Sequence, residues 1–148
     1  MLKEIIEQII NNLKEETKIS PEIKCIDYIC ILPKSEQEKK ELESEVQSIA
    51  KLFHTEKTGN LYLLDSPLKT PFGEIAIIKI RVFDESKLKW RGFPSLGLFD
   101  YRKFKKKYQN QHGFRLIKRP NYELLEYIGN DKVMYFPDIL LAQRVNKR

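Results

Sequence analysis

The sequence predicts an α+β protein in which an N-terminal helix precedes two successive β-α-β-β-β units. A run rich in β-branched residues at 74–83 is typical of a strand buried on at least one side. Patterns typical of helix and strand then follow in the same order in both halves, although the halves share almost no identities. The 148 residues are enough for one domain with a single core.

Apolar spacing and helix-start signals define the first half. Apolar residues recur at helical spacing near the N-terminus, which predicts an amphipathic helix packed on the domain. Ser35 followed by Glu38 is a capping box that starts a second helix. The predicted elements are a helix at 2–17, a strand at 23–32, a helix at 36–53, an extended piece at 54–57, and strands at 61–65 and 74–83. Module one therefore spans 23–83.

The second half repeats this order after a polar, basic link at 84–95. Residues 129–131, Gly-Asn-Asp, give a strong hairpin-turn signal between the last two strands, and Pro137 ends the second of them. The predicted elements are a strand at 96–100, a basic helix at 101–110, and strands at 114–119, 122–128 and 132–136. Module two therefore spans 96–137, and 138–148 is a short amphipathic tail compatible with a helix.

The two faces of the 74–83 strand differ in character, because alternate side chains of a strand point to opposite sides. One face is apolar and consists of Ala76, Ile78, Ile80 and Val82. The other carries two cations in an otherwise apolar row: Ile75, Ile77, Lys79, Arg81 and Phe83. This pattern suits a sheet with one face packed on helices and the other lining a partly wet concavity. On the 23–32 strand, the same alternation groups Tyr28 with Ile26, Cys30 and Leu32.

Composition narrows the class of protein. A hydrophobic share of 41% with 32% charged residues is that of a soluble globular protein, and no run of about 18 apolar residues exists to span a membrane. The N-terminus has acidic residues where a signal peptide would have its basic and then apolar regions, so no signal peptide is predicted. We therefore expect a cytoplasmic protein without membrane contact. Cys25 and Cys30 lie roughly 16 Å apart on one strand and cannot pair. With only His54 and His112 besides, no zinc spacing can be drawn.

The net charge of +6 is concentrated in one segment. Residues 87–119 contain eleven basic residues and one acid, Asp100. Such a local cluster can act as an electrostatic footprint for an anionic partner.

The order of elements resembles that of the vicinal oxygen chelate superfamily, the glyoxalase and bleomycin-resistance fold. Residues 26–29 (Ile-Asp-Tyr-Ile), the turn and strand at 57–65, and the stretch at 89–97 look similar to its YecM-like branch. The resemblance covers about 24–138. It implies that the two modules form a cupped mixed sheet with helices outside.

The resemblance also implies positions for a metal ion, held by four side chains from the first and last strands of each module. The matching positions hold Tyr28, Lys79 or Arg81, Leu98 or Phe99, and Tyr135. None is a good ligand for a divalent ion, and two cations would repel one. We therefore expect a cup without the superfamily metal and without a cofactor. A metal-dependent lyase, isomerase or dioxygenase with non-standard ligands is an alternative.

The expected lining of the cup suits a small anion, because guanidinium and phenol groups can satisfy carboxylate or phosphate oxygens where water is scarce. In another interpretation, Arg81 pairs with Glu123 or Glu126 and the tyrosines merely fill the cup. Trp90 and Arg91 belong to the set because their link can fold over the mouth of the cup. The candidate ligand-binding residues are Tyr28, Lys79, Arg81, Trp90, Arg91, Glu126 and Tyr135. Whether the protein is an enzyme, and whether it is a monomer or a homodimer, the sequence leaves open.

A nucleic-acid-binding module is the alternative from a different class. Cations interleaved with aromatic residues suit single-stranded nucleic acid, whose phosphates meet Lys and Arg and whose bases stack on rings. The candidate residues are Lys103, Lys105, Lys106, Lys107 and Arg115. In the alternative interpretation, Phe104 and Tyr108 form the buried apolar face of a helix, and its lysines form the solvent-exposed face and bind no nucleic acid.

Overall fold

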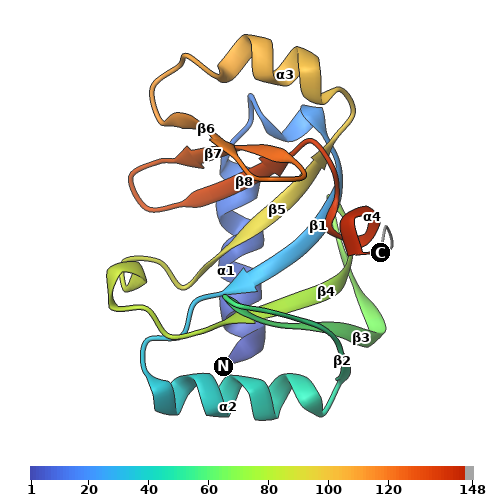
Figure 1. Cartoon of the computed structure of the whole chain (residues 1–148), viewed down its shortest axis with the longest axis vertical. Coiled ribbons are helices and arrows are strands. Elements are labelled where there is room, and N and C mark those ends of the chain that lie inside the picture. Colours follow the sequence, from blue (N-terminus) through green and yellow to red (C-terminus); the bar gives the residue numbers. More distant parts are fainter. Residues whose placement is uncertain (146–148) are drawn as a thin grey trace.

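A computed structural model, which describes residues 1–145, confirms the α+β fold with two β-α-β-β-β modules (Figure 1). The helices are α1 (Leu2–Glu15), α2 (Glu36–Gln47), α3 (Tyr101–Tyr108) and α4 (Leu141–Val145), with short 3-10 helices η1 (Ser20–Glu22) and η2 (Glu85–Lys87). The strands are β1 (Ile23–Ile31), β2 (Ala50–Glu56), β3 (Gly59–Thr70), β4 (Gly73–Arg81), β5 (Gly92–Leu98), β6 (Phe114–Lys118), β7 (Glu123–Ile128) and β8 (Val133–Pro137).

The strands form one curved mixed sheet in the order β2-β3-β4-β1-β5-β8-β7-β6. Each module contributes four neighbouring strands in the same internal order, with its first strand parallel to its last. The two first strands, β1 and β5, pair antiparallel in the middle. The halves are therefore related by an approximate two-fold axis between β1 and β5.

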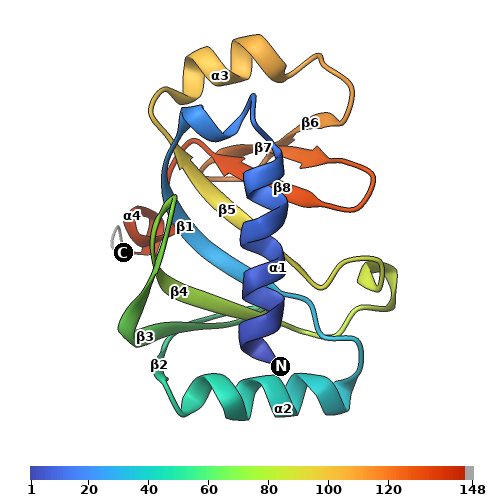
Figure 2. The same ribbon diagram turned by 180° about the vertical axis from the view of Figure 1, so that it is seen from behind.

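Three helices cover one face of the sheet. Seen from behind, α1 runs across the middle strands, between α2 at one end and α3 at the other (Figure 2). The apolar stripe of α1 packs with Leu42 and Val46 of α2, with Phe104 and Tyr108 of α3, and with one side of the sheet in a single core. The opposite, concave face is the cup, and α4 packs against it beside β1 (Figure 1). None of the helices within residues 1–145 is long and apolar enough to cross a membrane.

The predicted helix at 36–53 is too long. The backbone N–H groups of Ser48 and Ile49 bond to the carbonyls of Glu45 and Val46, in the tighter pattern that closes a helix. From Ala50 the chain is the strand β2, which pairs with β3, so the extended piece at 54–57 is the end of a longer strand. The apolar spacing around this junction fits either structure, and pairing with β3 decides for the strand.

Two other strands begin or end away from their predicted positions. β3 continues through Thr70, past the segment expected to be a connection, because an irregularity between Leu63 and Leu68 lets the strand pass Pro67 and keep pairing with β4. β5 begins at Gly92 rather than at 96, because its pairing with β1 runs to the end of that strand.

Three predicted face assignments are wrong, those of Ile26, Ile75 and Ala76; Ala76 packs with Leu61 and Leu141 on the side opposite the main core. Asp27 is an extra residue in β1, since Ile26 pairs with Leu96 and Tyr28 with the next residue, Ser95. This bulge turns Ile26 into the main core, away from Tyr28. Ile75 likewise lies in the core rather than in the row with Lys79. In the tail, α4 confirms helical structure at 141–145, and 146–148 lie outside the described residues.

The packing of α3 yields the first prediction. Phe104 is fully buried, with ring centroids of Tyr108 and Phe136 at 4.5 and 4.7 Å. Phe104→Ala leaves a large cavity there, and we expect it to lower the free energy of unfolding by about 3–5 kcal/mol in a denaturant titration. The matched change Phe99→Ala, at a side chain 71% exposed, should cost less than about 0.5 kcal/mol. Equal effects of the two changes would contradict this account of the core.

Candidate functional site

The cup contains a cavity of about 230 Å³ on the concave face, bordered by both modules. Tyr28 and Cys30 of β1, Phe93 and Ser95 of β5, and Tyr135 of β8 contribute to its walls. The lining is strongly basic: its cations are Lys79, Arg81, Lys87, Arg115, Arg119 and Arg144. Its single acid is Glu126.

Lys79 is a buried cation with two partners. Its Nζ lies 3.0 Å from Glu56 Oε1 and 2.6 Å from Thr58 Oγ1, both at the turn between β2 and β3. Gly59 brings this turn close to β4: its φ is +152°, and a Cβ there would lie 2.3 Å from the carbonyl oxygen of Ile80. The charge of Lys79 is therefore compensated within module one.

Arg81 follows on the same side of β4 but has no such partner. Its Nε is buried, and within residues 1–145 the side chain makes no hydrogen bond or ion pair. Buried N–H groups of a guanidinium are normally satisfied, since leaving one unpaired costs free energy. Arg81 is thus a buried donor directed at a polar cavity.

Arg144, on α4, is the second such arginine. Its guanidinium carbon lies 3.8 Å from the centroid of the Tyr122 ring, a cation–π contact. Its Nε–H is buried and has no acceptor among the described residues. Within residues 1–145, five buried side-chain atoms lack a hydrogen-bond partner, and three of them belong to residues lining the cup: Arg81, Glu126 and Arg144.

Glu126 has a charged neighbour, because its Oε1 lies 3.0 Å from Arg115 Nη2 in an ion pair that lacks the alignment of a hydrogen bond. Burial, with the nearby Glu126 carboxylate, raises the pKa of Tyr135 to about 12. Burial also raises the pKa of Tyr28 well above its usual value. Both phenols therefore keep their protons at neutral pH and can donate hydrogen bonds.

Asp27 connects β1, β5 and α4 beside the cup. Its Oδ2 accepts from Ser95 Oγ at 2.9 Å, and its Oδ1 accepts from the backbone N–H of Leu141 at 2.8 Å. Leu141 is itself buried against Leu61 and Ile77. The bulge at Asp27 thus fixes the start of α4, which carries Arg144 into the cavity wall.

Of the seven predicted ligand-binding residues, the structure brings five together in the cavity wall: Tyr28, Lys79, Arg81, Glu126 and Tyr135. Trp90 and Arg91 do not line it. Trp90 packs with a small cluster that includes Cys30 and Phe93, and Arg91 Nη1 lies 2.6 Å from Glu38 Oε1 at the start of α2. Their position is set by packing of the link against module one.

Sequence reasoning missed Lys87, Arg119, Tyr122 and Arg144 as wall residues. Arg119 and Tyr122 flank a Pro-Asn turn, and Arg144 lies in the tail, where no alternation indicates a face. The only available signal was the local excess of basic residues at 87–119, which does not separate cavity from surface.

Four residues of the nucleic-acid alternative lie on α3, and the fifth, Arg115, lies on β6 in the wall of the cup. Three are ion-paired: Lys105 with Glu123, Lys107 with Glu22 and Arg115 with Glu126. Lys103 and Lys106 are exposed, while Phe104 and Tyr108 are in the core and are not available for stacking.

The positions that would hold a metal in the resembled superfamily do not fit one. Lys79 Nζ and the Arg81 guanidinium offer positive charge, and the Tyr28 and Tyr135 hydroxyls keep their protons. In the described part of the chain, no group of three His, Cys, Asp or Glu side chains is placed to hold an ion. The cup's donor set is suited to anions.

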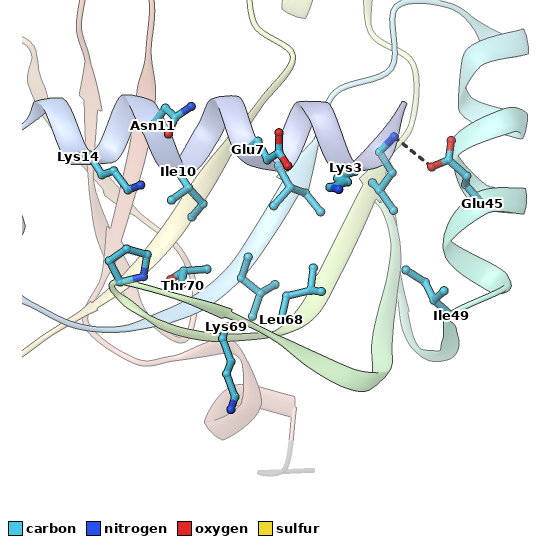
Figure 3. A pocket seen from close by; sticks show the side chains of 14 residues that line it. Lys3, Glu7, Ile10, Asn11, Lys14, Glu45, Ile49, Leu68, Lys69 and Thr70 are labelled. Atoms are coloured by element: carbon cyan, nitrogen blue, oxygen red, sulfur yellow. Dashed lines mark hydrogen bonds between the residues drawn. The ribbon is translucent and has the colours of Figure 1, made fainter.

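A larger hollow, about 720 Å³, lies on the opposite side between α1 and the end of β3 (Figure 3). Ile10, Ile49 and Leu68 face it, and Lys69 points away. Glu45 at one end accepts the backbone N–H of Leu2 at 3.0 Å. Among residues 1–145, none of the buried atoms without a partner lies in this wall. The cup is therefore the better candidate site.

Comparison with known proteins supports the fold class but gives no activity. The chain matches no protein-family model and no curated protein. A solved structure, the structural-genomics protein EC4020, is similar with a TM-score of 0.73, covering 99% of this chain and 92% of that chain at 10% sequence identity. At that identity the similarity shows a shared fold alone.

The environment of Asp27 yields a pH prediction. Burial raises its pKa from 3.8 to about 6, so the folded chain holds this proton more tightly than the unfolded chain. Protonated Asp27 therefore stabilises the folded chain by about 3 kcal/mol. This stabilisation is fully present below about pH 4 and is lost as the pH rises through 6. Asn at this position can still accept from Leu141 N–H and donate to Ser95 Oγ.

We therefore expect the unfolding free energy of the wild type, relative to Asp27→Asn, to fall by up to about 3 kcal/mol between pH 4 and 7. Denaturant titrations across this range measure the difference. Asp131→Asn, at an exposed position, is the control. A difference between wild type and Asp27→Asn that does not vary with pH would contradict the assignment.

Proposed function

We propose that the protein binds a small anionic molecule in the cup, without a metal ion, as a glyoxalase-fold protein of the vicinal oxygen chelate type. The observation that carries the proposal is Arg81, a guanidinium with a buried, unpaired N–H in the wall of a polar cavity. A carboxylate or phosphate oxygen would satisfy that donor with a charge-assisted hydrogen bond.

The charges of the cup support an anion rather than a neutral ligand. Among residues 1–145, six basic side chains and one acidic side chain line the wall. Two of the six are compensated, Lys79 by Glu56 and Arg115 by Glu126. The remaining excess of positive charge in a partly closed cavity raises the local concentration of anions and strengthens their binding.

The hydroxyls of Tyr28 and Tyr135 add neutral donors to this site. A cavity of about 230 Å³ is smaller than the ligand pockets of about 300–1,000 Å³ that hold drug-sized molecules, so the ligand is metabolite-sized. Glu126 supplies a carboxylate in the wall that could act as a base toward such a ligand.

The test is a thermal-shift panel of small carboxylates and phosphates at constant ionic strength. We expect members of the panel to raise the melting temperature, because a ligand that binds only the folded chain stabilises it. Arg81→Gln should weaken their binding by about tenfold or more, since one charge-assisted contact is lost. Arg102→Gln, an exposed arginine on α3 outside the cup, is the matched control and should bind like wild type.

Two results would reject this function. One is a panel in which no compound shifts the melting temperature, or in which Arg81→Gln binds as well as wild type. The other is salt-dependent binding of a single-stranded oligonucleotide that is lost in Lys103→Glu and Lys106→Glu and unchanged in Arg81→Gln. The second result would assign the function to the α3 surface instead.

A further inference from the structure

The cup's cations that have no ion-pair or hydrogen-bond partner within residues 1–145 form two groups, which come from different halves of the chain. Arg81 of β4 and Lys87 of η2 belong to the first half and the link. Arg119, at the turn between β6 and β7, and Arg144 of α4 belong to the second half and the tail. All four line the same cavity.

The two groups lie at opposite sides of the cup. In Figures 1 and 2, the yellow-green link between β4 and β5 and the red helix α4 lie at opposite lateral edges of the molecule. The charge of Arg81 acts on Cys30 and Tyr135, whereas the charge of Arg144 acts on Asp27 and Tyr28. Tyr28 and Cys30 are two residues apart on β1, which corresponds to roughly 7 Å.

The charges in the middle of the cavity compensate one another. Glu126 is opposite Tyr135 and Arg115 is opposite Glu126, with which it forms an ion pair, while Lys79, opposite Cys30, is paired with Glu56. The walls there also include the Tyr28 and Tyr135 side chains and the ring of Phe93, whose centroid lies 4.3 Å from that of Tyr135. A short carbon chain, bare or hydroxylated, suits this part of the wall. A molecule with one anionic group would leave one pair of cations without a partner.

We propose that the ligand of the cup is a small molecule with two anionic groups, one bound by Arg81 and Lys87 and the other by Arg119 and Arg144. This inference rests on the proposed anion-binding function and specifies its ligand class. Carboxylate and phosphate-type groups share the required chemistry, because both accept paired hydrogen bonds from a guanidinium.

The experiment compares anions of equal chain length by calorimetric titration of the full chain at constant ionic strength. Succinate, glutarate and adipate are paired with butyrate, valerate and hexanoate, and 3-phosphonopropionate replaces one carboxylate by a phosphonate. At least one two-ended anion should bind about tenfold or more tightly than its one-ended counterpart. Preference for 3-phosphonopropionate over succinate would identify the second group as phosphate-like, and the reverse preference would identify two carboxylates.

Variants locate the two ends. Arg81→Gln and Arg144→Gln should each reduce binding of the two-ended anion to about the level of the one-ended anion, and Arg102→Gln should leave it unchanged. Melting curves of all three variants check that they fold.

Equal affinity of one-ended and two-ended anions, with both lost in Arg81→Gln, would overturn the two-ended ligand and leave the anion-binding function intact. Absence of binding by every probe in folded wild-type protein would reject both.

Discussion

The antiparallel pairing of β1 with β5 is the interaction on which the rest of the molecule depends. Each module alone would be a four-stranded sheet with its first strand at an edge, and such an edge exposes unpaired backbone groups. Pairing the two first strands removes both edges and makes one eight-stranded sheet. It also gives α1 a continuous surface to cover, because its apolar stripe packs on strands of both halves.

The same pairing creates the cup. Its central wall consists of Tyr28 and Cys30 from one strand and Phe93 and Ser95 from the other. Since the halves are related by an approximate two-fold axis, the outer strands of each curl toward the same cavity from opposite sides. The bulge at Asp27 breaks this symmetry. The Asp27 carboxylate accepts a hydrogen bond from the backbone N–H of Leu141 and so holds α4 against one half of the cup only. The tail thereby supplies a wall that a symmetric fold would lack.

Much of the fold could be predicted from the sequence because β-branched runs, the capping box at Ser35 and the turn at 129–131 are local signals. The helix at 36–53 was predicted too long because Val46, Ile49 and Ala50 fit a helical stripe as well as the start of a strand. Only the pairing with β3, a long-range interaction, decides between them. The predicted face of Ile26 was wrong for a related reason. The bulge that turns Ile26 toward the core depends on pairing with β5 and on the hydrogen bond from Leu141 to Asp27, and both partners are far away in sequence.

For the site, the alternation along β4 indicated that Lys79 and Arg81 face a concave surface, and the resemblance implied that Tyr28 and Tyr135 face it too; all four line the cavity. What alternation could not show is that these two cations differ. Lys79 has Glu56 and Thr58 as partners because the turn between β2 and β3 closes over it.

Arg81, two residues further along, pairs through its backbone with Gly59 of that turn, but Glu56 and Thr58 bond to Lys79 and not to its guanidinium. The acid of the opposite wall, Glu126, has Arg115 as its partner. The expected alternative, in which Arg81 pairs with Glu123 or Glu126, is not what the structure contains: Glu123 accepts from Tyr101 and pairs with Lys105. Packing alone gives no reason to bury an unpaired guanidinium N–H, since an apolar group there would avoid the cost of its desolvation. The cavity in front of Arg81 supplies that reason if an anion occupies it. Arg144 adds a second buried N–H without a hydrogen-bond partner among residues 1–145, and the proposed two-ended anion would satisfy both arginines at once.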